Sequence, residues 1–506
     1  MCKLHPDGLL TNEVMPRAVG DAVDAVALIR FALARGSCQS GAILMTMRTA
    51  VNYFIHSLAL LLACAAQADA RPPNVVIFFT DDQGTLDAKC YGSQDLYTPN
   101  IDRLAATGVR FTQAYAHQVC CPARAMLLTG RHPQRGGVTY WTQGNARDVN
   151  KGRNMSLAEV TLAEVLRGAG YRTALFGKWH LGAHLEHGPT QQGFDAFFGI
   201  RGGFIDNYNH HFLHRDGFHD LYDGTEAVFA DGQYFPDLVT ARALQYIEQH
   251  KDVPFFLYVA FNIPHYPEQP DPQFDARYQQ LAMPRQSYAK MISTTDEHMG
   301  RIMQQLAQHG LTQNTIIVFM SDNGHSTEQP VIKVEDHRSG LAKGTHYGAH
   351  GGGGNSGKWR GQKGTFFEGG LRVPAIISYP AALPQGAVRD QAITAMDWMP
   401  TILELCELPL PAVALDGASL LPVIESATAP SPHSVLHWQW GKRWAVRAGP
   451  WKLVGKGTAG DFLGNLQEPQ PEVRNHLQAH PDVVQRLEAL HHAWLREGQP
   501  EAVHSL

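Results

Sequence analysis

One short stretch of the chain combines residue types that can do covalent chemistry. It sets Cys120 two residues before Pro122 and four residues before Arg124. Proline is well tolerated in a first helical turn, so we expect Cys120 at or just before the start of a helix. The free N–H groups and the dipole at a helix start favour an anion. The spacing indicates oxyanion chemistry, although Cys120 and Cys121 alone could equally be two small buried hydrophobic residues.

Oxygen-bearing side chains follow two apolar runs that are typical of buried strands. Asp81 and Asp82 come after the first run, and Asp322 and Asn323 come after the second. Carboxylate and amide oxygens form the ligand set that hard cations such as Ca²⁺ or Mg²⁺ require. Either pair alone is more often a turn former or a helix cap. The four residues are therefore candidate ligands for such an ion.

Basic side chains lie beside other apolar runs. Lys178 and His180 are two residues apart after one run, His265 follows another, and Lys363 precedes a third. Taken alone, such positions are ordinarily solvated surface.

These motifs resemble those of the type I sulfatases, a family that includes arylsulfatases and N-acetylgalactosamine-6-sulfatases. Cys-x-Pro-x-Arg from Cys120, followed by Thr-Gly-Arg at 129–131, resembles the family signature, although Ala123 stands where many members carry serine. The resemblance spans most of the chain. It implies an alkaline phosphatase-like fold and oxidation of Cys120, not Cys121, to formylglycine by a formylglycine-generating maturase.

The resemblance also implies a role for each candidate residue. Arg124, together with the metal, would make a formylglycine hydroxyl more nucleophilic. Lys178 would hold the sulfate, and His180 would hydrogen-bond the formylglycine hydrate and later act as a base. His265 and Lys363 would protonate or stabilise the departing alcohol. One Ca²⁺ would be bound by an oxygen of the formylglycine and by four side chains: Asp81, Asp82, Asp322 and Asn323.

The reaction explains why such a collection is needed. A sulfate ester is an anion, and its transition state spreads negative charge over several oxygens, so catalysis is mostly positioning and electrostatic stabilisation. A hydrated aldehyde at residue 120 supplies one hydroxyl that attacks sulfur in line, and its other hydroxyl drives the release of sulfate. We therefore expect a sulfuric ester hydrolase that yields an alcohol and inorganic sulfate.

The apolar runs alternate with helical patterns. This alternation predicts an α/β fold with a large, mostly parallel sheet flanked by helices. Residues 291–306 show the three-to-four spacing of a helix, which Gly310 would end. Strands are expected at 74–80, 172–176, 255–261, 315–320 and 373–378.

Near the C-terminus the pattern changes. Three short strand candidates, 434–440, 444–447 and 451–454, are separated by glycine turns, and a helix capped by Asp482 follows. This predicts a smaller antiparallel sheet with one helix. We expect a catalytic domain over 71–425 and this C-terminal subdomain over 426–506.

The N-terminal part has the pattern of an export signal. An apolar run at 49–63 follows Arg48 and precedes small residues, which predicts a signal peptide over 45–70. Residues 1–44 would then be a mis-assigned upstream extension. The alternative to cleavage before Arg71 is lipid attachment at Cys64, which would anchor the protein to a membrane. Either way, we expect a periplasmic or extracellular protein.

Composition excludes some classes of function. The 506 residues carry a net charge of -5, so the chain lacks the basic footprint of a nucleic-acid-binding protein. Seven cysteines in this length do not make a disulfide scaffold. Four of them lie after the predicted signal, so one bridge is allowed but not placed: Cys90, Cys120, Cys121 and Cys406.

Two other classes of protein compete with the sulfatase hypothesis. A related phosphoesterase would typically use threonine or serine with two metals, and Cys120 argues against it. A catalytically silent sulfated-glycan-binding protein would be expected to have lost some of the candidate catalytic residues.

The stretch 352–358 fits G-x-x-x-x-G-K, but Trp359 replaces the serine or threonine that would touch magnesium, so nucleotide binding is not expected.

The substrate depends on loops. Residues 200–222 and 325–361 are rich in histidine, aromatic residues or glycine, which suits sugar or aryl groups alike. Four histidines within 206–222 could also suggest a transition-metal site, but their spacing fits no compact ligand motif. A solvated loop or a wall of the substrate pocket is the favoured interpretation. Export favours a sulfated carbohydrate, with an aryl sulfate as the alternative.

Overall fold

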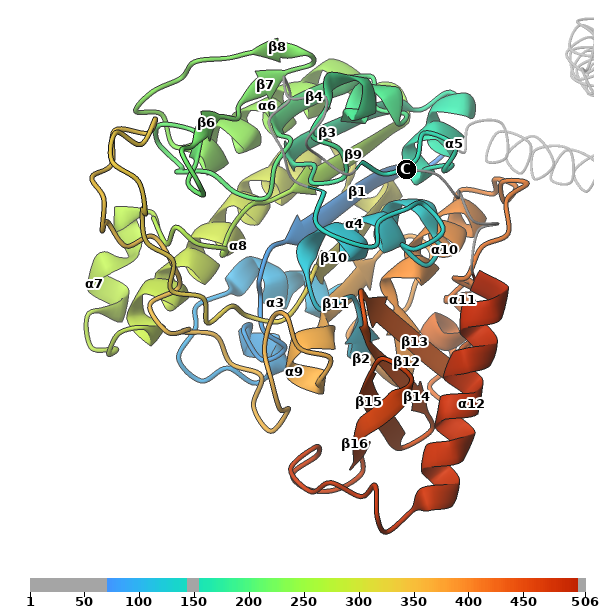
Figure 1. The fold of residues 1–506 in the computed structure, drawn as a ribbon. Helices are drawn as coiled ribbons and strands as arrows, with labels where there is room; N and C mark the ends of the chain where they lie inside the picture. The colour runs from blue at the N-terminus through green and yellow to red at the C-terminus, as the bar shows by residue number, and fades with distance from the viewer. Residues whose placement is uncertain (1–70, 143–153, 499–506) are drawn as a thin grey trace, which may run out of the picture. The chain divides into compact units, whose positions relative to one another are not determined.

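The computed structural model describes residues 71–142 and 154–498 of the chain. The predicted signal peptide, 45–70, and the upstream extension, 1–44, lie outside these residues. From Pro72 onward, the described residues belong to one compact unit (Figure 1). Among the described helices, none has both the length and the apolar character that crossing a membrane requires.

A mixed sheet of ten strands forms the centre of the described structure (Figure 1). Its members are β1 (Asn74–Thr80), β2 (Val109–Tyr115), β3 (Arg172–Lys178), β4 (Ala196–Ile200), β7 (Tyr222–Asp223), β8 (Glu226–Ala227), β9 (Phe255–Ala260), β10 (Thr315–Ser321), β11 (Arg372–Ser378) and β12 (Ala387–Thr394). They lie in the order β12-β2-β11-β10-β1-β9-β3-β4-β7-β8. The block β10-β1-β9-β3-β4 is parallel throughout.

The sheet confirms the predicted fold class and refines the predicted strands. All five predicted strands exist, with ends shifted by at most two residues. The strand expected at 373–378 is β11, which runs antiparallel to both of its neighbours, β10 and β2. The sheet is therefore parallel in its central block and mixed towards its edges. Several outer strands, including β2 and β4, were not predicted.

Helices cover both faces of the sheet. The helices of at least seven residues beside it are α3 (Pro99–Ala106), α4 (Cys120–Thr129), α5 (Leu162–Gly168), α6 (Phe235–His250), α8 (Arg285–Gln308) and α10 (Trp398–Leu405). Shorter α-helices are α7 (Asp275–Tyr278), α9 (Glu368–Leu371) and α11 (Leu421–Glu425). The short 3-10 helices are η1 (Lys89–Tyr91), η2 (Leu185–His187), η3 (Pro189–Gln191), η4 (Pro272–Phe274), η5 (Thr312–Asn314) and η6 (Ala395–Asp397).

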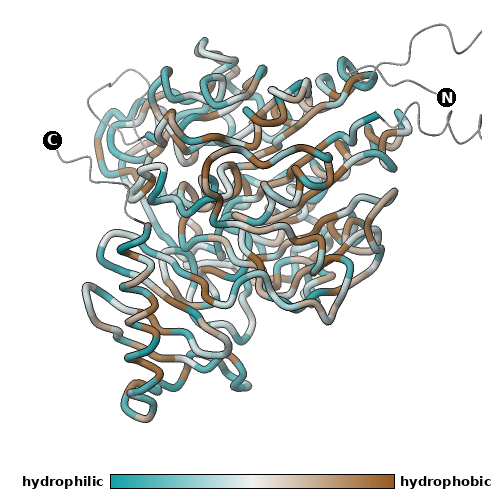
Figure 2. Tube along the Cα trace, turned by 90° about the vertical axis from the view of Figure 1, so that its right-hand side faces the viewer, coloured by the Kyte–Doolittle hydropathy of each residue, from teal (hydrophilic) through white to brown (hydrophobic). Residues whose placement is uncertain are grey.

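Alternate residues of the central strands feed two hydrophobic cores. Ile77 of β1 faces the core shared with α4, α5 and α10, whereas Phe78 faces the core shared with α3, α6 and α8. Every residue of β1 and β10 is buried, which explains why both read as continuous apolar runs in the sequence. Figure 2 shows hydrophobic segments running through the body of the molecule and hydrophilic segments at its periphery. The predicted helix over 291–306 lies within α8.

The C-terminal region forms a second sheet, as predicted. It contains β13 (Val435–Trp440), β14 (Arg443–Ala448), β15 (Trp451–Lys456) and β16 (Ala459–Asn465), all antiparallel, and α12 (Pro481–Gly498) packs on one face of it (Figure 1). Leu487 of α12 is fully buried against the sheet. The fourth strand was not predicted, and Asp482 lies in the first turn of α12 rather than at its cap. The domain boundary after residue 425 stays a prediction.

Buried charges join the two sheets. Glu368 of α9 accepts a hydrogen bond from the Tyr115 hydroxyl of β2 at 2.7 Å. Its carboxylate also pairs with Arg372 at 2.7 Å and with Lys452 of β15 at 3.0 Å. Burial alone would raise the pKa of Glu368, but the two cations hold it well below its usual range. The ionised carboxylate therefore links the C-terminal sheet to the large sheet.

Replacing Glu368 by Gln should reduce the free energy of unfolding by about 3 kcal/mol, because it leaves the buried Arg372 without its carboxylate partner, and Lys452 then keeps only Glu472. The pKa of Glu368 is lower in the folded protein than in the unfolded chain. The larger unfolding free energy of the wild type is therefore present at neutral pH and is lost as the pH falls below about 4.5, the ordinary pKa of glutamate. Denaturant unfolding of both proteins at several pH values measures the difference.

The matched control is Lys343→Gln, because Lys343 and Glu335 form an ion pair whose side chains are 54% and 74% exposed. We expect this change to alter the unfolding free energy by less than about 0.5 kcal/mol. Equal effects of the two substitutions would contradict a structural role for Glu368.

Candidate active site

The pairing of β1 with β10 brings the predicted metal ligands together. Thr80 lies opposite Ser321 in this parallel pair, so the next residues of both strands emerge at the same edge. Asn323 Nδ2 donates to Asp82 Oδ1 at 2.7 Å, and the Asp82 N–H donates to Asp322 Oδ1 at 3.2 Å. Asp81, Asp82, Asp322 and Asn323 are all buried. Four oxygen-bearing side chains thus meet at one point of the fold.

Cys120 faces this group from the start of a helix. It is the first residue of α4, as the sequence predicted, and Val119 precedes it in extended conformation. The Cys120 thiol lies 3.3 Å from Asp81 Oδ1. Burial and the carboxylates of Asp322 and Asp81 raise the pKa of this thiol well above 9, so it is not a ready thiolate nucleophile. Cys121 belongs to the hydrophobic core, and its thiol lies 3.8 Å from the Tyr140 carbonyl.

Three cations balance the three carboxylates. Arg124 lies one turn after Cys120 on α4, and its Nη2 donates to Asp322 Oδ2 at 2.8 Å. Lys178, the last residue of β3, contacts Asp81 Oδ2 through Nζ at 2.5 Å. Lys363 contacts Asp82 Oδ2 through Nζ at 2.9 Å. These cations come from three separate segments, and each is almost fully buried.

Two imidazoles complete the site. His265 donates from Nδ1 to the Tyr266 carbonyl at 2.6 Å, which leaves its Nε2 facing Asp82 Oδ2 at 3.7 Å. His180 is buried, and neither of its ring nitrogens has a hydrogen-bond partner among the described residues. Burial and the nearby lysines lower the pKa of both histidines well below 6.5. Both rings are therefore neutral and able to accept a proton.

The backbone is strained at two of these positions. Asp82 has a φ of 64° and His180 has a φ of 55°, in the left-handed region that residues with a Cβ rarely adopt. Such strain is kept where the surrounding structure demands it, which is often at functional sites. Nearby, Gly177 also has a positive φ, and a Cβ there would collide with the Ala260 carbonyl of β9. The close approach of β3 and β9 therefore requires a glycine.

The arrangement fits a hard divalent cation. Asn323 Oδ1 is buried without a hydrogen-bond partner among the described residues, although it is an acceptor beside three carboxylates. Burial raises the pKa of Asp82 and Asp322 to about 6, and the neighbouring carboxylates add to this effect. An ion bound between these oxygens would satisfy the free acceptor and offset the repulsion. Asp81, Asp82, Cys120 and His265 also offer ligand atoms within 4.8 Å of one another.

The site contains residues that the sequence did not single out. Glu328 contacts Lys363 Nζ at 3.3 Å, and the Tyr288 hydroxyl donates to the Asp82 carbonyl at 3.0 Å. The Phe204 ring stacks on His265 with a centroid distance of 5.1 Å. Glu328 lies in the glycine-rich loop and Tyr288 inside α8. Neither position carries a local motif that could have revealed it.

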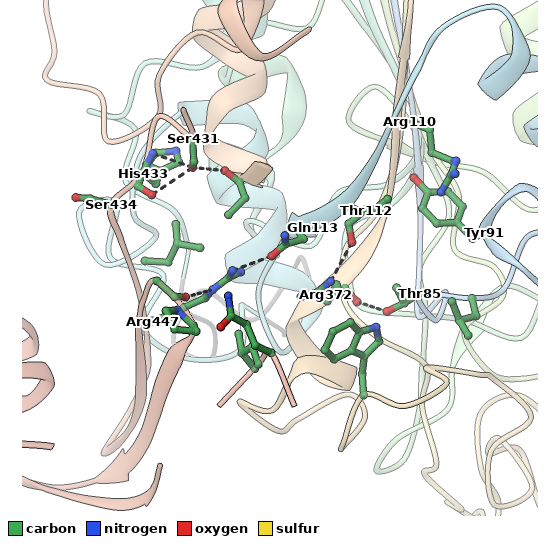
Figure 3. Close-up of a pocket in the computed structure, with 18 residues that line it drawn as sticks. Thr85, Tyr91, Arg110, Thr112, Gln113, Arg372, Ser431, His433, Ser434 and Arg447 are labelled. Atoms are coloured by element: carbon green, nitrogen blue, oxygen red, sulfur yellow. Dashed lines mark hydrogen bonds between the residues drawn. The ribbon is translucent and has the colours of Figure 1, made fainter. Parts of the chain in front are cut away.

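A cavity of about 580 Å³ lies elsewhere, at the junction of the two sheets (Figure 3). Its lining includes Arg372 and Arg447, but none of the predicted site residues. Both guanidinium groups donate to the Tyr115 hydroxyl, so they serve the junction itself. Volume alone therefore does not identify the reactive centre, whereas the grouping of carboxylates, cations and Cys120 does.

Comparison with known proteins identifies the family. The Sulfatase family model matches residues 73–408. The chain belongs to the sulfatase family. This sulfatase is 35% identical to human arylsulfatase A over 408 residues, which cover 75% of the chain and 73% of the relative. It is 31% identical to mouse arylsulfatase J over 393 residues, which cover 74% of the chain but 60% of that longer relative.

A solved structure extends the likeness to three dimensions. The fold superposes on Ps i-CgsB, crystallised in complex with k-i-k-neocarrahexaose, with a TM-score of 0.73 and 26% identity. The match covers 86% of this sulfatase and 95% of the other chain. The predicted family, enzyme class and fold are therefore confirmed. The roles of the individual site residues stay predictions.

Replacing Asp322 by Asn should weaken the binding of Ca²⁺ by at least about tenfold, because ligand charge sets the affinity of an oxygen-donor site. Isothermal titration calorimetry on chelator-treated protein measures this change. Asp216→Asn is the control, because Asp216 is a 69% exposed carboxylate that also pairs with an arginine. Equal affinity of the wild type and Asp322→Asn would exclude this site as the calcium site.

Proposed function

We propose that this sulfatase is an exported enzyme that hydrolyses sulfate esters of carbohydrates, using a formylglycine made from Cys120 and one Ca²⁺. The reaction would cleave an S–O bond and release an alcohol and inorganic sulfate. One observation carries the proposal: the Cys120 side chain, at the first residue of α4, lies 3.3 Å from Asp81 within the buried group of carboxylates and cations.

Two groups that the chain would acquire supply the reactive chemistry. The formylglycine would provide a hydroxyl nucleophile for sulfur, and Ca²⁺, held by Asp81, Asp82, Asp322 and Asn323, would provide positive charge beside it. The chain's own charges prepare this arrangement. Three buried carboxylates are balanced by Arg124, Lys178 and Lys363, so a divalent cation would give the site a net positive charge. An anionic sulfate ester would then be attracted to it.

His180 is suited to act as a base. It is neutral because burial and the cations Lys178 and Arg124 lower its pKa, and both ring nitrogens lack partners among the described residues. The Trp141 ring stacks on it with a centroid distance of 6.1 Å, which limits its rotation. A proton taken up by His180 would help to release the sulfate in the second half of the reaction.

Lys363 and His265 are suited to the leaving group. Burial lowers the pKa of Lys363, but the Asp82 carboxylate outweighs this effect and raises it well above 10.5. The side chain therefore stays charged and stabilises a developing alkoxide. The pKa of His265 is lowered, so in the free site it is neutral. A bound sulfate anion would favour its protonated form, which could then donate a proton from Nε2 to the departing oxygen.

The side chains around the site suit the sulfate ester of an organic group. Phe204, Tyr266 and Tyr347 belong to one buried aromatic cluster, and Tyr266 lies 5.5 Å from Lys363 Nζ. Aromatic walls with a few polar groups are typical of binding sites for small organic ligands. The related Ps i-CgsB was crystallised with an oligosaccharide. A sulfated carbohydrate is therefore the favoured substrate, and an aryl sulfate is the alternative.

The location and the maturation partner also belong to this proposal. Export would depend on the signal predicted over 45–70, and the lipid-anchored alternative would use Cys64. A formylglycine-generating maturase would oxidise Cys120. Since Cys120 is only 1% exposed in the folded protein, that enzyme would have to act before folding is complete.

Two competing functions remain testable. A phosphoesterase of the same fold would typically place serine or threonine where this chain has Cys120. A silent glycan-binding protein would not need the complete set of basic residues that surrounds the carboxylates. The presence and convergence of Arg124, Lys178, His180 and Lys363 support the hydrolase.

Co-expression with the maturase should convert Cys120, but not Cys121, to an aldehyde. Mass spectrometry with fragmentation of the tryptic peptide 111–124 separates the two positions. Cys120→Ala should lower kcat/KM for a sulfate ester by at least about a thousandfold, because it removes the nucleophile. Cys121→Ala is the matched control and should keep both the modification and most of the activity.

Retention of both thiols would oppose this proposal, provided that a control sulfatase in the same host is modified. In that case the glycan-binding alternative would become the favoured one.

His265→Asn should slow hydrolysis of a sugar sulfate by about a hundredfold or more, because an alkoxide leaving group needs a proton. A nitrophenyl sulfate has a much better leaving group, so the same variant should lose far less activity towards it. Steady-state kinetics with both substrates measures the ratio. An equal loss with both substrates would indicate a role other than leaving-group protonation.

A further inference from the structure

A small hairpin lies beside the candidate active site. Strands β5 (His211–Phe212) and β6 (Phe218–His219) pair with each other outside the large sheet. The Phe212 ring packs on Phe204 at 5.0 Å, and Phe204 in turn stacks on His265 at 5.1 Å. The position of this hairpin therefore affects the space in front of the leaving-group residues.

The hairpin contributes histidines to a second possible metal centre. His210, His219 and Asp231 each offer one ligand atom, and these atoms lie within 4.8 Å of one another. His210 directly precedes β5, His219 ends β6, and Asp231 lies in the segment before α6. The sequence spacing of these residues matches no compact ligand motif, so the fold is what brings them together.

The hydrogen bonds of His210 prepare it as a ligand. Its Nε2 lies 3.1 Å from the Gln233 carbonyl, which can only accept, so this nitrogen carries the proton. The lone pair is then on Nδ1, which is buried without a partner among the described residues. A carbonyl that fixes the tautomer of a ligating histidine in this way is a common feature of metal sites. His210 also has a φ of 60°, so its backbone is held in a strained conformation.

His219 has a matching free nitrogen. Its Nε2 is also buried and has no partner among the described residues. Burial lowers the pKa of His210, and burial with the neighbouring histidines lowers that of His219 to about 4. Both rings are therefore neutral at physiological pH, which is the form that binds metals. A buried ring nitrogen without a partner is unfavourable, and a shared ion would satisfy both nitrogens at once.

We propose that His210, His219 and Asp231 bind a transition-metal ion such as Zn²⁺, which fastens the β5–β6 hairpin to the segment before α6. Imidazole and carboxylate donors suit zinc, whereas the calcium site proposed above has oxygen ligands. Donors that share a zinc ion at about 2.1 Å lie at most about 4.2 Å apart. The three ligand atoms lie within 4.8 Å of one another, and the exposed side chain of Asp231 can move to adjust its distance to a shared ion. Water would fill the fourth position of a tetrahedral site.

The test uses untagged full-length protein that has been stripped with a chelator and reloaded with Ca²⁺. Titration with Zn²⁺, followed by elemental analysis of the desalted protein, should give one bound zinc per chain. His219→Gln should weaken this binding by at least about tenfold, since it removes a ligand. His211→Gln is the matched control, because His211 is adjacent in space but its Nδ1 is engaged by the Asn209 carbonyl at 2.9 Å.

Melting temperatures separate lost binding from lost folding. In chelator, the wild type and His219→Gln should have the same melting temperature. Zinc should raise the melting temperature of the wild type only. If His219→Gln fails to fold, Asp231→Asn tests the same site, because Asp231 is exposed. Equal zinc binding by the wild type and the ligand variants would overturn the proposal. So would zinc that is lost in Cys120→Ala but not in His219→Gln.

Discussion

The burial of three carboxylates at the end of β1 and β10 is the constraint around which this sulfatase is organised. Parallel pairing places Asp81, Asp82 and Asp322 at one edge of the sheet, away from water. Buried like charges are strongly unfavourable unless cations compensate them. Three other segments supply these cations: α4 contributes Arg124, β3 contributes Lys178, and the loop before α9 contributes Lys363. The sheet brings the carboxylates together, and the composition of the site follows from the need to balance their charge.

The protein cations do not satisfy every buried polar group of the site. Asn323 Oδ1 and both ring nitrogens of His180 are buried without partners among the described residues. The left-handed backbone conformation of Asp82 and His180 is also energetically unfavourable. Under the proposed function, a bound ion and an anionic substrate would provide partners for these unpartnered atoms. Such a site would favour ligand binding at some cost to the folding stability of the protein.

The surroundings of the site are held by two different kinds of interaction. Glu368 and its cations connect the C-terminal sheet to the large sheet through buried ion pairs. The β5–β6 hairpin pairs over only two residues per strand, and His210 and His219 beside it are two of the three ligands of the proposed zinc site. The sheets thus position the candidate catalytic residues, whereas the hairpin beside them is held mainly by side-chain contacts. This division agrees with specificity being carried by loops.

The sequence by itself determined the local structure around Cys120 and the central strands. Cys-x-Pro-x-Arg placed Cys120 at a helix start, and continuous apolar runs identified β1 and β10, because both signals act between near neighbours in the chain. Only the tertiary structure decided which distant groups meet. Three features depend on how distant segments pack together: the antiparallel direction of β11, the contact of Glu328 with Lys363, and the grouping of His210 with Asp231. Such contacts follow from packing between distant segments, which leaves no periodic signal in either segment alone.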